Sequence, residues 1–194
     1  RAVEIAIRAL TGAELSSSKL DAVVSTGFCG ALDPLLRECQ VIVATGVLDL
    51  DANETFECAP VDADSAFTSG LLLAQDRIAN SAAQKQQLQA HGALAIDMES
   101  GGVAARAKRA TLPFYSIKVV SDRADESFPL DLNSMRTPDG RIGRVKIGIH
   151  ALTHPKVLRS LFHWKRRSGD AAKALGDFLV SCRIRPKSDT ALAE

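Results

Sequence analysis

The sequence predicts an α/β fold with a mixed, mostly parallel central sheet. Short apolar runs alternate with stretches of helical periodicity along the 194 residues, and this alternation favours parallel strands joined by helices. Three runs, at 20–25, 93–96 and 113–120, each end at small or acidic residues. Because ligands lie beyond the carboxyl ends of parallel strands, these three ends predict a single site.

Six segments are candidate strands. They are residues 20–25, 41–47, 55–58, 69–73, 93–97 and 114–120. The segment 41–47 is the most β-branched of them. Residues 49–66 are acidic and poorly periodic, so we expect a surface excursion that carries only a short edge strand at 55–58. The glycine-containing segment 26–30 is predicted to be a turn after the first strand.

Helices are expected between the strands and towards the C-terminus. Ser81 can cap a helix that ends near His91-Gly92, and a second helix follows Glu99. The remaining predicted segments are an amphipathic one at 5–10, a loop at 123–141, helices at 141–152 and 155–166, an interruption at 168–170, and a last helix that Asp170 caps. We expect one domain over 1–182 and a disordered tail at 183–194.

Composition narrows the class of protein. Hydrophobic residues make up 46% of the chain and charged residues 24%, which is typical of a soluble globular domain. A net charge of +1 provides no general attraction for nucleic acid or for an anionic membrane, and no apolar run has the length of a membrane span. The four cysteines form no C-x-x-C pair, which favours reduced thiols in the cytoplasm over a zinc or disulfide framework.

The strand ends carry the residues that could do chemistry. Glu99 is either a charge at the start of a helix or a ligand-binding group, and the flexible Gly101-Gly102 favours the second. Asp122 is either a turn residue or a general acid. The glycine-containing segment 26–30 could hold a phosphate or a base, and Cys29 within it is read as a buried thiol rather than a nucleophile.

No metal is predicted. His150 and His154 have the i, i+4 spacing of a helical metal pair, but Pro155 follows directly and no acidic partner is near. We interpret them as surface or helix-end histidines.

Three motifs together carry a resemblance to a known family. They are VSTGFCGAL at 24–32, DMES at 97–100 and VVSDRAD at 119–125. In this order and spacing the chain resembles the nucleoside phosphorylase and nucleosidase superfamily. It is most similar to the methylthioadenosine/S-adenosylhomocysteine nucleosidases and their hopanoid-associated phosphorylase relatives. The resemblance runs from about residue 20 to residue 126.

The resemblance implies a phosphorylase/hydrolase-like, three-layer α/β/α fold from which the N-terminal strands are missing. Those strands would carry the Glu that activates water in the nucleosidases and some phosphate contacts in the phosphorylases. It also implies cleavage of the N-glycosidic bond of a purine nucleoside. The expected substrate is a 5′-substituted adenosine of the methylthioadenosine or S-adenosylhomocysteine type.

By the same resemblance, Asp122 protonates N7 of the purine and Ser121 positions it. Glu99 holds the ribose hydroxyls and Met98 packs under the sugar. The remaining substrate-binding residues implied are Phe28, Cys29 and Gly30, which line base and sugar, and Ile78 and Ala79, in a segment whose backbone contacts the purine edge. Ile78 departs from the family, which usually has an aromatic ring there.

The alternatives are a phosphorylase that takes phosphate as co-substrate, a non-catalytic nucleotide-binding module, and a fragment that serves only as an oligomer partner. No cofactor is expected. We expect the protein to form a homodimer or a larger homo-oligomer.

Overall fold

The computed structural model describes residues 20–128, 131, 133–134 and 155–184. The amphipathic segment at 5–10, the helix predicted at 141–152, His150, His154 and residues 185–194 of the predicted tail lie outside these ranges. None of the helices within the described residues has a stretch long and apolar enough to cross a lipid bilayer.

One sheet of six strands forms the centre of the fold. Its members are β1 (Val23–Ala31), β2 (Val41–Asp49), β3 (Glu54–Glu57), β5 (Thr68–Ala74), β6 (Ala95–Asp97) and β7 (Phe114–Asp122), in the order β3-β2-β5-β6-β1-β7. A further pairing joins β2 to β7, so the sheet closes on itself. β1–β7, β2–β5 and β5–β6 are parallel, whereas β1–β6, β2–β3 and β2–β7 are antiparallel. The predicted mixed sheet is confirmed.

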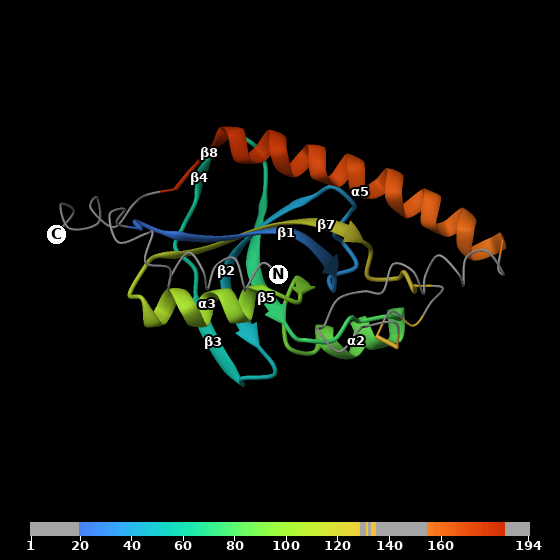
Figure 1. Cartoon of the computed structure of the whole chain (residues 1–194), viewed down its shortest axis with the longest axis horizontal. Coiled ribbons are helices and arrows are strands. Elements are labelled where there is room, and N and C mark those ends of the chain that lie inside the picture. The colour runs from blue at the N-terminus through green and yellow to red at the C-terminus, as the bar shows by residue number, and fades with distance from the viewer. Residues whose placement is uncertain (1–19, 129–130, 132, 135–154, 185–194) are drawn as a thin grey trace, which may run out of the picture.

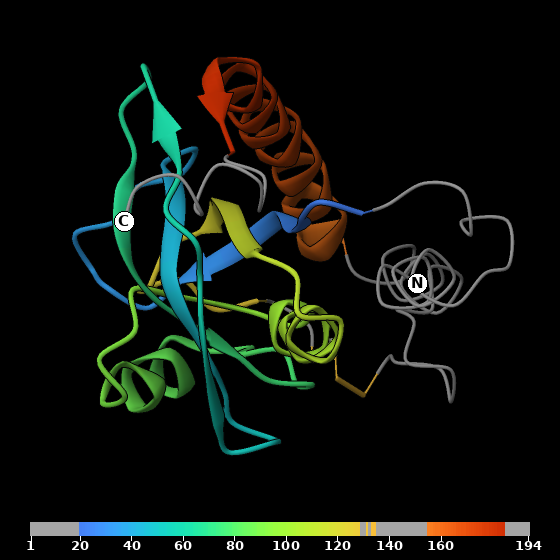
Figure 2. The ribbon, with the colours of Figure 1, turned by 90° about the vertical axis from the view of Figure 1, so that its left-hand side faces the viewer.

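Helices lie on both sides of this sheet, which gives the expected three layers (Figures 1 and 2). They are α2 (Ala82–Gln89), α3 (Ser100–Arg109) and α5 (Pro155–Ser181). α5 packs Ala171, Leu175 and Phe178 against a buried cluster that includes residues of β2 and β7. α3 packs Val103, Ala104 and Ala107 into a second cluster on the other side. Two short strands, β4 (Asp62–Ala63) and β8 (Cys182–Arg183), pair separately.

Several predicted elements are confirmed. The β-branched run is β2, the short edge strand is β3, and β5 and β7 lie where expected. α2 begins with a full capping box, because Ser81 Oγ accepts from the Gln84 amide and the Gln84 side chain accepts from the Ser81 amide.

The glycine-containing segment 26–30 is a strand, so the predicted turn is wrong. β1 continues through it to Ala31, because the whole run pairs in parallel with β7, from Val23 opposite Phe114 to Gly30 opposite Asp122. A register shift follows Cys29, which lies opposite Val120, so that Ser121 is an extra residue on β7. Gly27 has φ 145°, a backbone angle that favours glycine.

The predicted interruption at 168–170 is also wrong, because α5 runs without a break through Gly169. A glycine inside a helix costs about 1 kcal/mol. The helix recovers more than this by burying Ala171, Leu175 and Phe178 against the sheet. Arg183, which falls within the predicted tail, pairs with Asp62 in the small sheet.

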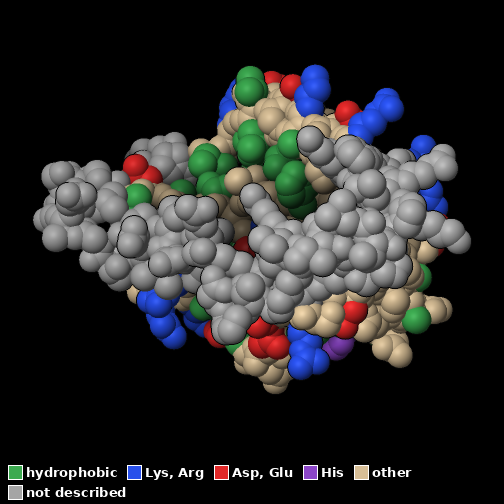
Figure 3. Space-filling view, turned by 45° about the vertical axis from the view of Figure 1, so that its right-hand side comes forward, with side chains coloured by type: hydrophobic (Ala, Val, Ile, Leu, Met, Phe, Trp, Pro, Cys, Tyr) green, Lys and Arg blue, Asp and Glu red, His purple; other side chains and the backbone are tan. Residues whose placement is uncertain are grey.

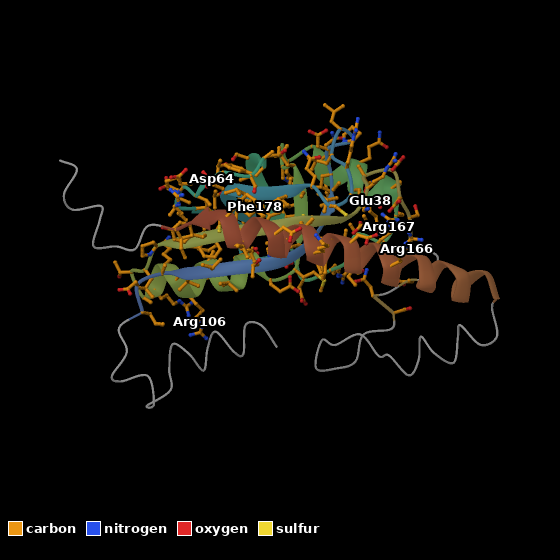
Figure 4. The ribbon with its side chains drawn as sticks, turned by 90° about the horizontal axis from the view of Figure 1, so that it is seen from above. Glu38, Asp64, Arg106, Arg166, Arg167 and Phe178 are labelled. Atoms are coloured by element: carbon orange, nitrogen blue, oxygen red, sulfur yellow. The ribbon has the colours of Figure 1, made fainter. Side chains whose placement is uncertain are left out.

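Arg167 of α5 ties the helix to the loop after β7. It donates to the Glu126 carboxylate and to the carbonyl of Ser121, and it pairs with Glu38 at 2.6 Å (Figure 4). Burial raises the pKa of Glu126, but the hydrogen bonds from Arg167 and from the Arg123 amide, together with the charges of Arg167 and Lys85, outweigh burial and hold that pKa below its usual range. Because the folded-state pKa is lowered, this stabilisation is present above the unfolded pKa and is lost as pH falls through the folded one.

Replacing Arg167 with Met is therefore expected to lower the free energy of unfolding at pH 7 by about 1–2 kcal/mol. The difference from the parent protein should shrink as pH falls through the lowered pKa of Glu126, because protonation removes the charge that Arg167 holds. Urea unfolding at pH 7 and pH 3.5 measures both effects. The exposed neighbour Arg166, changed to Met, is the control and should change stability by less than about 0.5 kcal/mol. Equal losses at both pH values would contradict the assignment.

Candidate active site

All nine residues implied by the sequence line one cavity. It encloses about 160 Å³, smaller than most ligand pockets, so a nucleoside bound there would extend to its open side. The lining comprises Phe28, Cys29, Gly30, Arg77, Ile78, Ala79, Lys85, Ile96, Asp97, Met98, Glu99, Ser121, Asp122 and Phe128. Hydrophobic side chains also gather in a hollow on the face shown in Figure 3.

The strand ends meet, but not as three parallel strands. β1 and β7 run in parallel and finish together, with Gly30 opposite Asp122. β6 is antiparallel to β1 and pairs only with its last residues, Gly30 and Ala31. β6 therefore crosses the end of β1, and this crossing delivers Met98 and Glu99 to the same cavity. The predicted convergence occurs through a mixed sheet.

The Asp122 carboxylate is held at both oxygens. Lys85 Nζ lies 2.5 Å from Oδ2, and Ser121 Oγ donates to Oδ1 at 2.7 Å. The side chain is 14% exposed, so it can still meet a ligand. Each carboxylate oxygen offers two lone-pair sites, so one site per oxygen remains open to a bound base.

Gly30 makes room for this carboxylate. A Cβ built at Gly30 would lie 2.9 Å from Asp122 Oδ2, closer than real Cβ contacts allow. Gly30→Ala should displace the carboxylate and lower kcat/KM for base release by about 10²-fold, as small misplacements of a reacting group do. Steady-state kinetics measure the loss. Gly176→Ala, where a Cβ meets nothing within 4 Å, should leave kcat/KM unchanged. Full activity of Gly30→Ala would show that the reaction does not depend on the present position of the Asp122 carboxylate.

Glu99 is not used by the helix that it precedes. It occupies the N-cap position of α3 without a side-chain capping hydrogen bond, and it is exposed. Asp97 does the capping instead, since its carboxylate accepts from both the amide and the hydroxyl of Ser100. The Glu99 carboxylate is therefore available at the cavity wall.

A buried polar network supports this wall from behind. Lys118 Nζ lies 2.6 Å from Asp97 Oδ2, with exposed fractions of 2% and 0% for the two side chains. Ser100 Oγ is within hydrogen-bond distance of the hydroxyls of Ser25 and Ser116, at 3.1 Å each. These bonds join β1, β6, β7 and α3 and fix the chain just before Met98 and Glu99.

Cys29 is a buried thiol, as the sequence indicated. Its exposed fraction is 3%, and burial, followed by the nearby Asp97 charge, raises its pKa far above the usual value. A neutral, buried thiol is a poor nucleophile. Cys29 therefore serves as a wall of the cavity, and its carbonyl lies 3.2 Å from Ser121 Oγ, whose single hydrogen it shares with the closer Asp122 Oδ1.

The segment 76–79 reaches the cavity, but the polar backbone groups of Ile78 are already bonded. The Ile78 amide donates to Asn133 Oδ1 at 2.9 Å, and its carbonyl accepts from Asn133 Nδ2 at 2.8 Å. A purine that used these two groups would have to replace the Asn133 side chain. An amide side chain and a purine edge offer the same pairing of one donor with one acceptor.

Comparisons with known proteins agree with this geometry. A sequence model of the phosphorylase superfamily matches residues 67–137 of the chain, which confirms the suspected resemblance. The chain has the fold of the phosphorylase superfamily. It is similar to a 5′-methylthioadenosine/S-adenosylhomocysteine nucleosidase from Helicobacter pylori, with a TM-score of 0.52, 19% identity, and coverage of 64% of this chain and 62% of that one.

The chain is also similar to two further solved structures. The nucleosidase from Neisseria meningitidis gives a TM-score of 0.52 at 22% identity, covering 64% of this chain and 65% of that one. The futalosine hydrolase of Helicobacter pylori gives 0.53 at 18% identity, covering 64% and 63%. None of the curated proteins matches. The chain thus spans slightly less than two thirds of these structures.

The sequence analysis did not single out two lysines that hold carboxylates of this site, Lys85 beside Asp122 and Lys118 beside Asp97. Lys118 could have been found, because a lysine inside the apolar run 113–120 must have a buried partner. Lys85 gave no such signal, since it stands among polar residues of α2.

Proposed function

We propose that this protein cleaves the N-glycosidic bond of a purine nucleoside. The observation that carries the proposal is the position of Asp122 and Glu99 on the walls of one cavity, although one ends β7 and the other precedes α3. The phosphorylase-superfamily fold supports it.

The two carboxyl groups have complementary tasks in this reaction. Breaking the bond between ribose and base places positive charge on the sugar and negative charge on the leaving base. Asp122 gives a proton to N7 of the base, with Ser121 holding its carboxyl group. Glu99 binds the ribose hydroxyls, and its negative charge stabilises the cationic sugar. Met98 and Phe28 supply apolar contact beside the sugar and base.

The substrate proposed is a 5′-substituted adenosine. Support comes from similar structures that are described as methylthioadenosine/S-adenosylhomocysteine nucleosidases. Phosphate as the nucleophile is the second candidate, favoured by the match to the phosphorylase superfamily. We also propose that the protein works in the cytoplasm. We further propose that it forms a homodimer or larger homo-oligomer, and analytical sedimentation would test this oligomeric state.

Adenine release from methylthioadenosine and S-adenosylhomocysteine, assayed with and without phosphate, tests the proposal. Release that does not depend on phosphate indicates hydrolysis, and release that requires phosphate indicates phosphorolysis. A protein that binds adenine by calorimetry but releases none would be a non-catalytic binding module. If the protein neither binds adenine nor releases a base from any purine nucleoside, the proposed function is wrong.

A further inference from the structure

Lys85 is the buried residue of α2, and its ammonium group lies inside the candidate site. The residue is 1% exposed. Its Nζ contacts Asp122 Oδ2 and the carbonyl of Arg123, both at 2.5 Å, and lies 5.7 Å from the centre of the Phe128 ring. These contacts give the ammonium group two hydrogen-bond acceptors and an aromatic face. Lys85 also lines the cavity.

Anchoring α2 does not require a charge. Burying an ammonium group is costly, and replacing both partners of a buried ion pair with apolar side chains of similar volume is commonly neutral or stabilising. Moreover, Lys85 pairs with Asp122, the residue that donates the proton to the base in the proposed function. The packing of the Lys85 methylene groups therefore does not explain why a charged group lies beside Asp122.

The ion pair poses a question about that proton. In the pair, the hydrogen lies on Nζ and the carboxylate is charged, whereas a general acid must carry a hydrogen on its own oxygen. A hydrogen that starts on Lys85 Nζ is already within hydrogen-bond distance of Asp122 Oδ2.

We propose that Lys85 is a positioning residue that orients Asp122 and supplies the proton that Asp122 delivers; this inference rests on the proposed function. As the glycosidic bond breaks, its electron pair goes to the base. One hydrogen passes from Asp122 to N7, and one passes from Lys85 Nζ to Asp122. The products of the step are a protonated base, a sugar cation, a charged carboxylate and a neutral amine. The nucleophile that attacks the sugar then loses a proton, which restores the ammonium group.

Other charges surround the pair and belong in any account of its pH dependence. Asp125 and Glu126 in the loop after β7 both interact with the Lys85 charge. Arg167 of α5 interacts with Asp122. Asp97 and Glu99 line the same cavity. These groups remain unchanged in the variants below, so differences between the variants report on position 85.

Two variants separate orientation from proton supply. Lys85→Met removes both, so kcat on a purine nucleoside should fall about 10²-fold while KM changes less than threefold. Its rate should rise as pH falls, about tenfold per pH unit, because the proton then comes from solvent, whereas the parent protein should show a plateau. Lys85→Arg keeps a charge that cannot be deprotonated. It should therefore restore the ion pair with Asp122, and the stability that Lys85→Met loses with it, but not the rate. Lys173→Met, at an exposed ion pair, is the control.

Calorimetry gives a readout that does not need turnover. Adenine N7 accepts a hydrogen bond, so contact with Asp122 requires a hydrogen on the carboxyl group. At pH 8, in buffers of different ionisation enthalpy, the parent protein should take up close to no protons on binding adenine. Lys85→Met should take up about one.

The outcomes distinguish this inference from the proposed function. If the parent protein binds adenine and Lys85→Met matches it in proton uptake and in pH profile, Lys85 is an anchor only and the inference is overturned. The same holds if Lys85→Arg restores the full rate. If the parent protein neither binds adenine nor releases a base, the proposed function is wrong and the inference is overturned with it.

Discussion

Replacing Asp122 with Asn is expected to lower kcat for adenine release by about 10²–10⁴-fold, the usual contribution of a positioned general acid. The amide fills nearly the same space but cannot donate an acidic proton to N7. It also removes the charge opposite Lys85, so the free energy of unfolding should fall as well, because a buried ammonium group is left without its partner. Stopped assays of adenine release, together with urea unfolding, measure the two effects.

A substrate that needs no proton isolates the catalytic part of this loss. A riboside with a nitrophenolate leaving group departs without protonation, so Asp122→Asn should cleave it within about tenfold of the parent rate. Asp125→Asn, three residues away and in an exposed pair with Arg123, should behave as the parent protein does with both substrates. An equal loss with both substrates would show that Asp122 supports the structure of the site rather than the proton transfer.

Replacing Glu99 with Gln is expected to lower kcat/KM by about 10²-fold, because a charge facing the cationic sugar is lost from a partly enclosed site. The amide can still bind a ribose hydroxyl, so part of the ground-state affinity should remain. Because the Glu99 side chain makes no capping hydrogen bond to α3, stability should stay within about 0.5 kcal/mol of the parent value.

Kinetics with a purine nucleoside and a thermal melt test the Glu99 prediction. Glu57→Gln on the edge strand β3, an exposed residue outside the cavity lining, is the matched control. A large fall in melting temperature with unchanged kcat/KM would assign Glu99 to the helix and remove it from the site.

Much of the site could be predicted because its residues sit at strand ends. The apolar runs that became β6 and β7 stop at Asp97 and Asp122, and a sheet brings such ends together whatever the details of pairing. The DMES and VVSDRAD motifs added roles to these positions by resemblance. The cavity lining in the structure includes every residue chosen, and the roles stay predictions.

The errors arose where long-range contacts overrule local sequence. The glycines of 26–30 indicate a turn when taken alone, but β7 offers a pairing partner along that whole length. Gly169 indicates a break, yet the apolar residues that follow it find a surface on the sheet. Lys85 is hidden for the same reason, because only the folded chain places it beside Asp122, 37 residues away.

The pairing of β2 with β7 has a consequence for how the protein resists opening. Both strands have neighbours on each side, so their amides are held by the ring of strands and should exchange with deuterated solvent only when the ring itself opens. Among the described members of the sheet, β3 has one neighbour, and its exposed Glu57 places a charge on this edge strand that discourages another chain from adding there. Isotope labelling should therefore reach β3 well before the strands that carry the site.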